Sequence, residues 1–310
     1  MEQQVIISNL INNIEKVIVG KKKVIKLCIA ALISNGHILI EDVPGLGKTM
    51  LARSLAKTID AEFKRIQFTP DLLPSDITGV SIYNQKTQEF EPNFGPIFAN
   101  IVLADEINRT TPRTQSGLLE CMEDSLVTID GTTYHLPSPF FVIATQNPIE
   151  SYGTYPLPEA QMDRFLLQID IGYPLRDEET LIIEKRLKVN PLEQISSVVN
   201  LEQINLLQQK ALDIYLSPDL LNFITDIVRA TRNHPDIAQG ASPRACLAIM
   251  RVSRAMALLA GRDFVTPDDI KGIFFYALQH RILLNTHINI KEKSKKKILE
   301  DVLQSVPIPL

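Results

Sequence analysis

The stretch HILIEDVPGLGKTMLARSLAKTI, residues 37–59, decides the fold. Its first five residues form a short apolar run, which predicts a buried strand over 37–41. Leucine and isoleucine then recur at every fourth residue, which predicts a helix over 48–59. A glycine-containing loop separates the two. A strand, a loop and a helix in direct succession are typical of α/β proteins, in which helices cover a parallel sheet.

The loop at 42–49 fits the phosphate-binding pattern G-x-x-x-x-G-K-[ST], except that Asp42 stands in place of the first glycine. Its glycines allow backbone N–H groups to point at phosphate oxygens. Lys48 can reach the β- and γ-phosphates, and Thr49 can ligate Mg²⁺. The alternative is a glycine turn that merely joins a strand to a helix. The position of the loop between a strand and a helix favours the phosphate site.

Three more apolar runs continue the alternation of strands and helices as far as about Tyr173, namely residues 63–68, 101–106 and 140–146. Such nearly continuous apolar runs suit central strands that are buried on both faces of a sheet. We therefore expect a parallel sheet covered by helices, with these runs as its inner strands.

The run at 101–106 ends in two acidic residues, Asp105 and Glu106. Ionised carboxylates at the tip of an apolar strand are costly unless a cation or a reacting water holds them there. We expect Asp105 to bind Mg²⁺, mostly through water, and Glu106 to polarise the water that attacks the γ-phosphate. Two solvated loop acids are the alternative, which the phosphate loop at 42–49 disfavours.

Three further polar residues are candidates for the same chemistry. Asn147 follows the run at 140–146, where its amide could orient the attacking water, although Asn-Pro is also an ordinary turn signal. Arg164 lies in DRF, and Arg244 lies in SPRA at the start of a predicted helix. Either could be a surface arginine. A guanidinium group aimed at the γ-phosphate would stabilise the charge that develops in phosphoryl transfer.

The second part of the chain has a different periodicity. After Tyr173-Pro174 the pattern is helical to the end, with helix starts at Ser217, Ser242 and Thr266, each followed by proline. The pattern predicts an α/β domain over 1–172 and a smaller all-helical domain over 173–310.

Two insertions in the first domain have the pattern of β-hairpins. One covers about 79–91, and the other covers about 126–136 and contains an Asp-Gly turn, which is a strong hairpin signal. Decoration of a sheet edge is the alternative to a role in binding a partner.

Composition limits the class of protein. The 310 residues are 45% hydrophobic and 22% charged, which is ordinary globular usage. The net charge of −4 argues against a protein that mainly coats nucleic acid. Three cysteines without a C-x-x-C pair indicate neither a disulfide framework nor a cysteine zinc site. Because no basic leader or uninterrupted apolar span is visible, we expect a cytoplasmic protein without a membrane segment.

Taken in order, GLGKT, LADE, QNP, DRF and SPRA resemble the Walker A, Walker B, sensor 1, arginine finger and sensor 2 motifs of an AAA+ ATPase with a helical lid. Longer stretches resemble the MoxR family, in the helix-2-insert clade: EDVPGLGKT, QFTPDLLPSDITG, ADEINRTTPRTQ, FFVIATQNP and GTYPLPEAQMDRFL. The resemblance covers nearly the whole chain. It implies an AAA+ P-loop core with a central parallel sheet, followed by a smaller helical lid. In that family the residue at Asp42 is commonly not glycine.

The resemblance also implies ligands, assembly and residue roles. It implies ATP hydrolysis with Mg²⁺ in a homo-oligomeric ring, usually a hexamer, in which Arg164 reaches the nucleotide of the neighbouring subunit. Arg109 and Arg113 are either further interface residues or ordinary charges on a helix surface. The implied catalytic residues are Glu106, Asn147, Arg164 and Arg244. The implied nucleotide contacts are Val19, Gly20, Pro44, Gly45, Leu46, Gly47, Lys48, Thr49, Met50 and Arg244.

Three functions follow from the resemblance. The favoured one is an ATP-driven remodelling or maturation factor for a protein client, often a client with a von Willebrand factor A domain. A metal-chelatase motor subunit is an alternative from the same clade. A DNA-associated motor is disfavoured because the hairpin tip at Asp130-Gly131 has no cation for a phosphate backbone, so we expect no nucleic acid partner.

Overall fold

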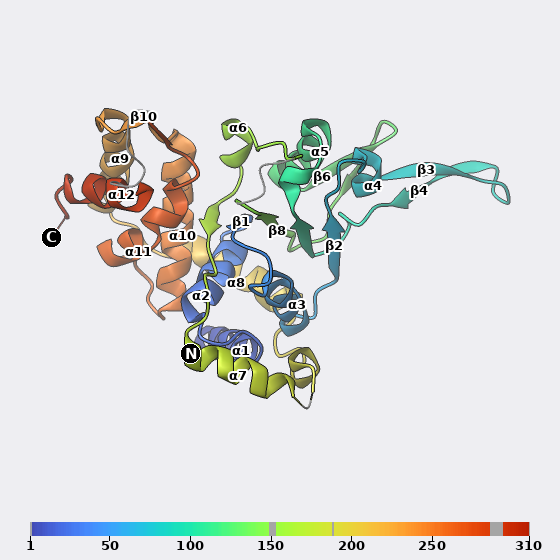
Figure 1. Ribbon diagram of the computed structural model, residues 1–310, viewed down its shortest axis with the longest axis horizontal. Coiled ribbons are helices and arrows are strands. Elements are labelled where there is room, and N and C mark those ends of the chain that lie inside the picture. The colour runs from blue at the N-terminus through green and yellow to red at the C-terminus, as the bar shows by residue number, and fades with distance from the viewer. Residues whose placement is uncertain (1, 149–152, 188, 286–293, 310) are drawn as a thin grey trace.

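The computed structural model describes residues 2–148, 153–187, 189–285 and 294–309. Its centre is a five-stranded sheet in the order β2-β5-β8-β1-β9 (Figure 1). All neighbouring strands of this sheet pair in parallel. The strands are β1 (Ile38–Glu41), β2 (Phe63–Gln67), β5 (Ile101–Asp105), β8 (Phe141–Gln146) and β9 (Leu167–Ile169).

Alternate residues of the strands belong to two separate apolar clusters, because successive side chains of a strand point to opposite faces. In β1, Ile38 and Ile40 pack with the N-terminal helices, α3 and the lid, whereas Leu39 packs with α4, α5 and the second hairpin. Within the described ranges, no helix is long and apolar enough to cross a membrane. The helices of this part are α1 (Glu2–Glu15), α2 (Lys22–Ile33), α3 (Lys48–Thr58), α4 (Pro74–Thr78), α5 (Pro112–Asp124), α6 (Glu159–Met162) and α7 (Arg176–Arg186), with a 3₁₀ turn at Ile107–Arg109.

The predicted strands all form, but the prediction that 63–68 is a central strand is wrong. This run becomes β2, which lies at the edge of the sheet and pairs with β5 alone. Its side chains at Lys64, Arg65 and Gln67 are exposed, as an edge position permits. The other edge, β9, was not predicted from the sequence, because its three residues are too short to give a periodic pattern.

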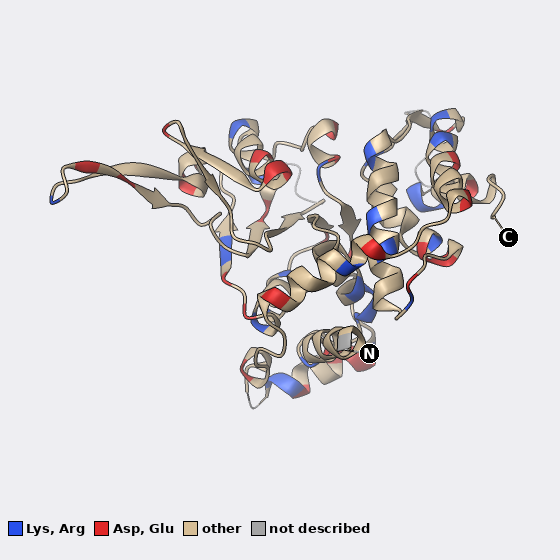
Figure 2. Ribbon diagram, turned by 180° about the vertical axis from the view of Figure 1, so that it is seen from behind, with Lys and Arg blue, Asp and Glu red and all other residues tan. Residues whose placement is uncertain are grey.

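Both predicted hairpins are present. The first consists of β3 (Gly79–Asn84) and β4 (Glu89–Phe94), so it continues three residues beyond the expected end at 91. It projects far from the body of the molecule and carries few charged segments along its length (Figures 1 and 2). The second consists of β6 (Leu126–Ile129) and β7 (Thr132–His135). Its turn residues Asp130 and Gly131 both have positive φ, as the Asp-Gly pattern predicts.

The C-terminal part is helical, and its three predicted helix starts are confirmed. The hydroxyl groups of Ser217 and Ser242 accept hydrogen bonds from backbone N–H groups in the first turns of α9 and α10, and Thr266 begins a capping box. A short antiparallel pair, β10 (Ile237–Gln239) with β11 (Leu283–Leu284), adds to the helices and was not predicted. The helices are α8 (Leu201–Asp213), α9 (Pro218–Asn233), α10 (Pro243–Leu259), α11 (Pro267–Leu278) and α12 (Lys295–Gln304), preceded by a 3₁₀ turn at Pro191–Gln194.

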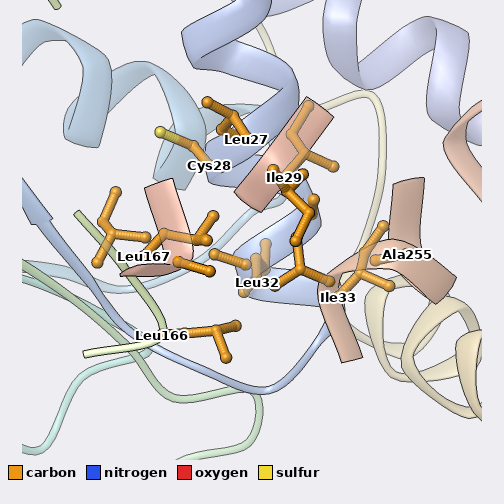
Figure 3. Packing of buried hydrophobic residues seen from close by; sticks show 14 of the residues in the cluster. Leu27, Cys28, Ile29, Leu32, Ile33, Leu166, Leu167 and Ala255 are labelled. Carbon is orange, nitrogen blue, oxygen red and sulfur yellow. The ribbon is translucent and has the colours of Figure 1, made fainter. Parts of the chain in front are cut away.

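Helix α2 joins the sheet to the lid through buried side chains. Leu32 and Ile33 of α2 lie between Leu167 of β9 and Ala255 of α10 (Figure 3). These residues belong to one continuous apolar cluster that includes both the sheet and the lid helices. The burial of this shared surface holds the lid against the core. The domain boundary at residue 172 stays a prediction.

Candidate active site

The loop between β1 and α3 is shaped by two glycines. Gly45 and Gly47 have φ values of 88° and 86°, a region that side-chain-bearing residues rarely adopt. Lys48 begins α3, and its Nζ donates to the carbonyl oxygens of Asp42, at 2.5 Å, and of Gln146, at 3.5 Å. The lysine side chain therefore bends back over the carboxyl edge of the sheet. Thr49 lies beside it in the first turn of α3.

Several acidic residues of the site lie close enough to Lys48 to act on its charge. Burial lowers the pKa of the Lys48 ammonium group, and the carboxylates of Asp42, Asp105, Glu106 and Glu41 oppose that shift. Lys48 and the two acids at the end of β5 therefore form one charged cluster, although they are far apart in the sequence.

Thr145 of β8 orients both acids. Its Oγ1 donates to Asp105 Oδ1 at 2.7 Å and accepts from the Glu106 N–H at 2.8 Å. Glu106 follows the strand in a left-handed conformation, with φ 59° and ψ 50°, which is uncommon for a residue with a long side chain. Thr145 was not predicted, because a threonine inside an apolar strand gives no signal of its own.

Three residues beside β5 hold the free ends of the two carboxylates. Arg65 Nη2 lies 2.6 Å from Asp105 Oδ2, and Gln67 Nε2 donates to Glu106 Oε2 at 2.9 Å. Arg109 Nε lies 3.0 Å from the same Glu106 oxygen. Arg65 and Gln67 were missed; their signal is the pair of polar side chains on one side of β2, which becomes informative only once β2 is known to lie next to β5.

Asn147 directly follows β8 and is 6% exposed. Its neighbour Gln146 supplies the carbonyl oxygen that accepts from the backbone N–H of Asp42, at 3.2 Å, and from Lys48. The structure therefore brings Asn147 to the same edge of the sheet as the loop. Residues 149–152 lie outside the described residues.

An apolar cavity, here called the loop cavity, lies beside the phosphate loop. Its walls come from the segment after α1, the loop itself, the chain after β9 and α7. Its lining includes Val19, Gly45, Leu46, Gly47, Met50, Ile171 and Gly172. Gly20 follows Val19 with a φ of 72°, a conformation that strains residues with a side chain, so the turn favours glycine there.

The two predicted arginines lie together in a different place. Arg164 Nη1 donates to the Leu119 carbonyl at 2.7 Å, and its Nη2 lies 3.3 Å from Glu123 Oε2. Arg244 Nη2 lies 2.7 Å from Glu123 Oε1. Both line what we call the arginine cavity, together with Glu123, His37 and Arg281. Neither arginine lines the loop cavity, and the expected contact of Arg244 with a nucleotide stays a prediction.

A buried ion pair between core and lid fixes the arginine cavity. Arg281, whose side chain is 3% exposed, places Nε 2.6 Å from Asp163 Oδ1. Burial lowers the pKa of Arg281, and Asp163 opposes the shift. The other oxygen of Asp163 accepts from Ser242 Oγ at 2.9 Å, and Ser242 caps the helix that begins next to Arg244. Asp163 therefore positions both Arg164 and Arg244; Arg281 was missed because its partner is distant in the sequence.

Comparison with known proteins identifies the family. The model of the ATPase family associated with various cellular activities (AAA) matches residues 37–167, and the AAA lid domain matches residues 229–302. The chain is 42% identical to the chaperone MoxR1 of Mycobacterium tuberculosis over 305 residues, which cover 96% of this chain and 80% of that protein. The chain belongs to the MoxR family of AAA+ ATPases.

Two further comparisons agree with this assignment. The MoxR-family chain is 49% identical to the uncharacterised protein YeaC of Bacillus subtilis over 300 residues, which cover 97% of this chain and 94% of that one. A crystal structure from Cytophaga hutchinsonii, named as a candidate ATPase, matches with a TM-score of 0.92 and 41% identity, covering 100% of this chain and 96% of that chain. The predicted fold, a parallel-sheet AAA core with a helical lid, is confirmed for this MoxR-family chain.

Proposed function

We propose that this MoxR-family chain hydrolyses ATP in a ring of identical subunits, six by family resemblance, and uses the reaction to remodel or mature a protein client. One observation carries the proposal. The groups suited to phosphoryl transfer occupy two separate surfaces of the chain: Lys48 and the acids Asp105 and Glu106 lie at the loop, and Arg164 and Arg244 lie in the arginine cavity. Contact between the two surfaces of neighbouring copies would bring them together.

The loop residues fit ATP and Mg²⁺. The conformations of Gly45 and Gly47 turn the backbone around the start of α3, where N–H groups favour anions, and Lys48 adds a positive charge. The apolar loop cavity beside them suits the base. Thr49 and Asp105 would hold Mg²⁺, which commonly takes one or two protein ligands together with phosphate oxygens. The ion would supply positive charge at the β- and γ-phosphates.

The remaining residues at the sheet edge act on the attacking water. The contacts of Glu106 with Gln67 and Arg109 both engage Oε2, and we assign Oε1 to the water. Thr145 fixes the backbone from which this carboxylate extends. Asn147, buried at the tip of the neighbouring strand, would hold the water in line with the γ-phosphate.

The arginines act across a subunit contact in this proposal. Glu123 holds Arg164 and Arg244 side by side, which presents two guanidinium groups as one unit. A neighbouring copy that docks its loop against this cavity would receive both charges near its γ-phosphate. The contact joins two different surfaces, and repetition of such a contact closes a ring when the rotation permits it.

The proposed client contact involves the long hairpin β3–β4. Its Ile82, Tyr83 and Phe90 are 53%, 53% and 72% exposed, which is typical of surfaces that bind other proteins. Residues 79–94 carry one lysine, Lys86, and two glutamates, a poor match to a phosphate backbone. The name of the relative MoxR1 describes a chaperone, which supports a protein client. A von Willebrand factor A domain in the client and a cytoplasmic location stay predictions.

Two substitutions should distinguish ATP binding from ATP hydrolysis. Lys48→Ala removes the charge at the phosphates, so we expect ATP affinity to fall about tenfold to a hundredfold. Glu106→Gln keeps the shape but cannot activate water, so ATP affinity should persist while turnover falls by about 10² to 10⁴. Titration with fluorescent ATP and phosphate release measure the two effects. Lys57→Ala, on the exposed end of α3, is the control. A wild-type rate in Glu106→Gln contradicts the assignment.

A further inference from the structure

Asp42 makes contacts that the glycine of the general pattern could not make. Its Oδ1 accepts from the N–H of Val43, within the phosphate loop, at 2.9 Å. Its Oδ2 accepts from the N–H groups of Ile171 and Gly172, both at 2.8 Å. One carboxylate therefore joins the phosphate loop to a segment that follows β9, far along the chain.

The segment that is hydrogen-bonded to Asp42 forms a wall of the loop cavity. Ile171 and Gly172 line this cavity together with Val19 and Met50. Gly172 has a φ of 68°, so the chain turns there on its way from β9 to α7. The Asp42 carboxylate thus connects the phosphate loop to the wall of the cavity that we assign to the base.

Both the charge and the backbone conformation of Asp42 indicate that the acid contributes to the site. The backbone of Asp42 is not in the left-handed region, so nothing in the turn requires glycine there. A carboxylate beside a phosphate site repels the ligand, so an acid at this position needs contacts that offset that cost. Here both oxygens accept from backbone N–H groups, and hydrogen bonds to an ionised acceptor are the stronger kind.

We propose that Asp42 is a positioning residue that holds the phosphate loop and the base-side wall at a set separation, so that the site recognises a whole nucleotide rather than a phosphate chain alone. The proposal rests on the proposed function, because it assumes that the loop binds ATP. The proposed phosphate site consists of Gly45, Gly47 and Lys48. Substitution of the Asp42 side chain leaves these three residues in place.

The experiment compares two probes, ATP and inorganic tripolyphosphate, by calorimetric titration of the full chain. Asp42→Asn keeps the size but turns an N–H₂ group or a single oxygen toward the two donors, and Asp42→Gly restores the general pattern. In both variants we expect ATP affinity to fall about tenfold, while tripolyphosphate affinity does not fall, because each substitution removes a negative charge near the phosphate site. Asp60→Asn, an exposed acid after the same helix α3, should change neither value.

The other outcomes are distinguishable. An equal loss of affinity for both probes would mean that Asp42 only maintains the loop. Unchanged affinity for both would mean that the contact of Asp42 with Ile171 and Gly172 does not contribute to binding. Either result overturns the proposal. If wild-type and Lys48→Ala proteins bind ATP equally well, the proposed function itself fails. Circular dichroism of both Asp42 variants verifies that they are folded, and the preserved tripolyphosphate affinity of Asp42→Gly verifies that the loop is formed.

Discussion

The loop edge of the sheet and the arginine cavity are assembled from different parts of the molecule. At the loop edge, Asp105 and Glu106 are held by Thr145 and by residues of β2, all within the α/β core. In the arginine cavity, Arg244 comes from the lid and is placed by contacts across the junction between core and lid. The difference teaches that contacts within the core suffice to place the two acids, whereas placing Arg244 also needs a docked lid.

The largest expected effect tests whether the two regions complete each other across copies. Arg164→Ala and Arg244→Ala should each lower turnover by about 10³, because arginine contacts to the γ-phosphate contribute on that scale. ATP affinity should change little, since the loop cavity contains neither side chain. Phosphate release and nucleotide titration measure both values. Arg229→Ala, on the exposed face of α9, is the control.

Mixtures sharpen this result. Arg164→Ala protein mixed with Lys48→Ala protein should regain some hydrolysis, because one type of contact then contains an intact loop and an intact arginine. The absence of any recovery, in mixtures shown to exchange subunits, would show that Arg164 acts on the nucleotide of its own chain.

A smaller effect concerns the stability of the protein in acid, which depends on a histidine in the arginine cavity. His37 lines the arginine cavity, and burial lowers its pKa from 6.5 to about 4, although the Nε2 contact with the Met122 carbonyl opposes the shift. In the unfolded chain the imidazole takes up a proton near pH 6.5, whereas in the folded chain it does so only near pH 4. The free energy of unfolding should therefore decrease as pH falls from about 6.5 to about 4, by about 3 kcal/mol for this group.

Urea denaturation at several pH values checks this dependence. His37→Gln should be less stable at neutral pH but should lose less stability between pH 6.5 and pH 4 than the wild type. His135→Gln, in the exposed second hairpin, should follow the wild-type profile. Identical pH profiles for wild type and His37→Gln would show that the buried imidazole is not a source of acid sensitivity.

The smallest effect concerns a third region that belongs to neither half. Replacing 84–87 by a two-residue turn should leave basal hydrolysis within about twofold of the wild type, because a loop on a rigid scaffold can change while the site stays formed. Stimulation by a client with a von Willebrand factor A domain should disappear. Phosphate release with and without that client is the measurement, and replacing Asp130-Gly131 by a different two-residue turn should have the same two effects. Stimulation by DNA that is lost in Lys86→Ala would favour a DNA-associated motor instead.

Local chemistry made much of the fold predictable. Glycines at 45 and 47 and the caps at Ser217 and Ser242 act within a few residues of themselves, so their structural effect is visible in the sequence. The apolar runs also identified four of the five strands of the central sheet. The motif order supplied the candidate residues, from Lys48 to Arg244, and their roles stay predictions.

The partners of these residues could not be predicted, because they depend on which distant segments meet. Nothing near Glu123 indicates that it joins Arg164 to Arg244, and nothing near Arg65 indicates that it faces Asp105. The position of β2 at an edge likewise follows from the strand order and not from its own composition. The motif therefore singled out Arg244 without revealing that Glu123 holds it beside Arg164.

The strand order also has a consequence for how the chain is made. β1 lies between β8 and β9, both of which are synthesised much later than β1. The phosphate loop therefore leaves the ribosome long before the strands that hold it, and α2 exposes its apolar face during that time. Pairing of such distant segments also costs loop-closure entropy and slows folding. Stalled nascent chains should accordingly become resistant to protease only after Ile169 has emerged, which places the folding of this ATPase late in its own translation.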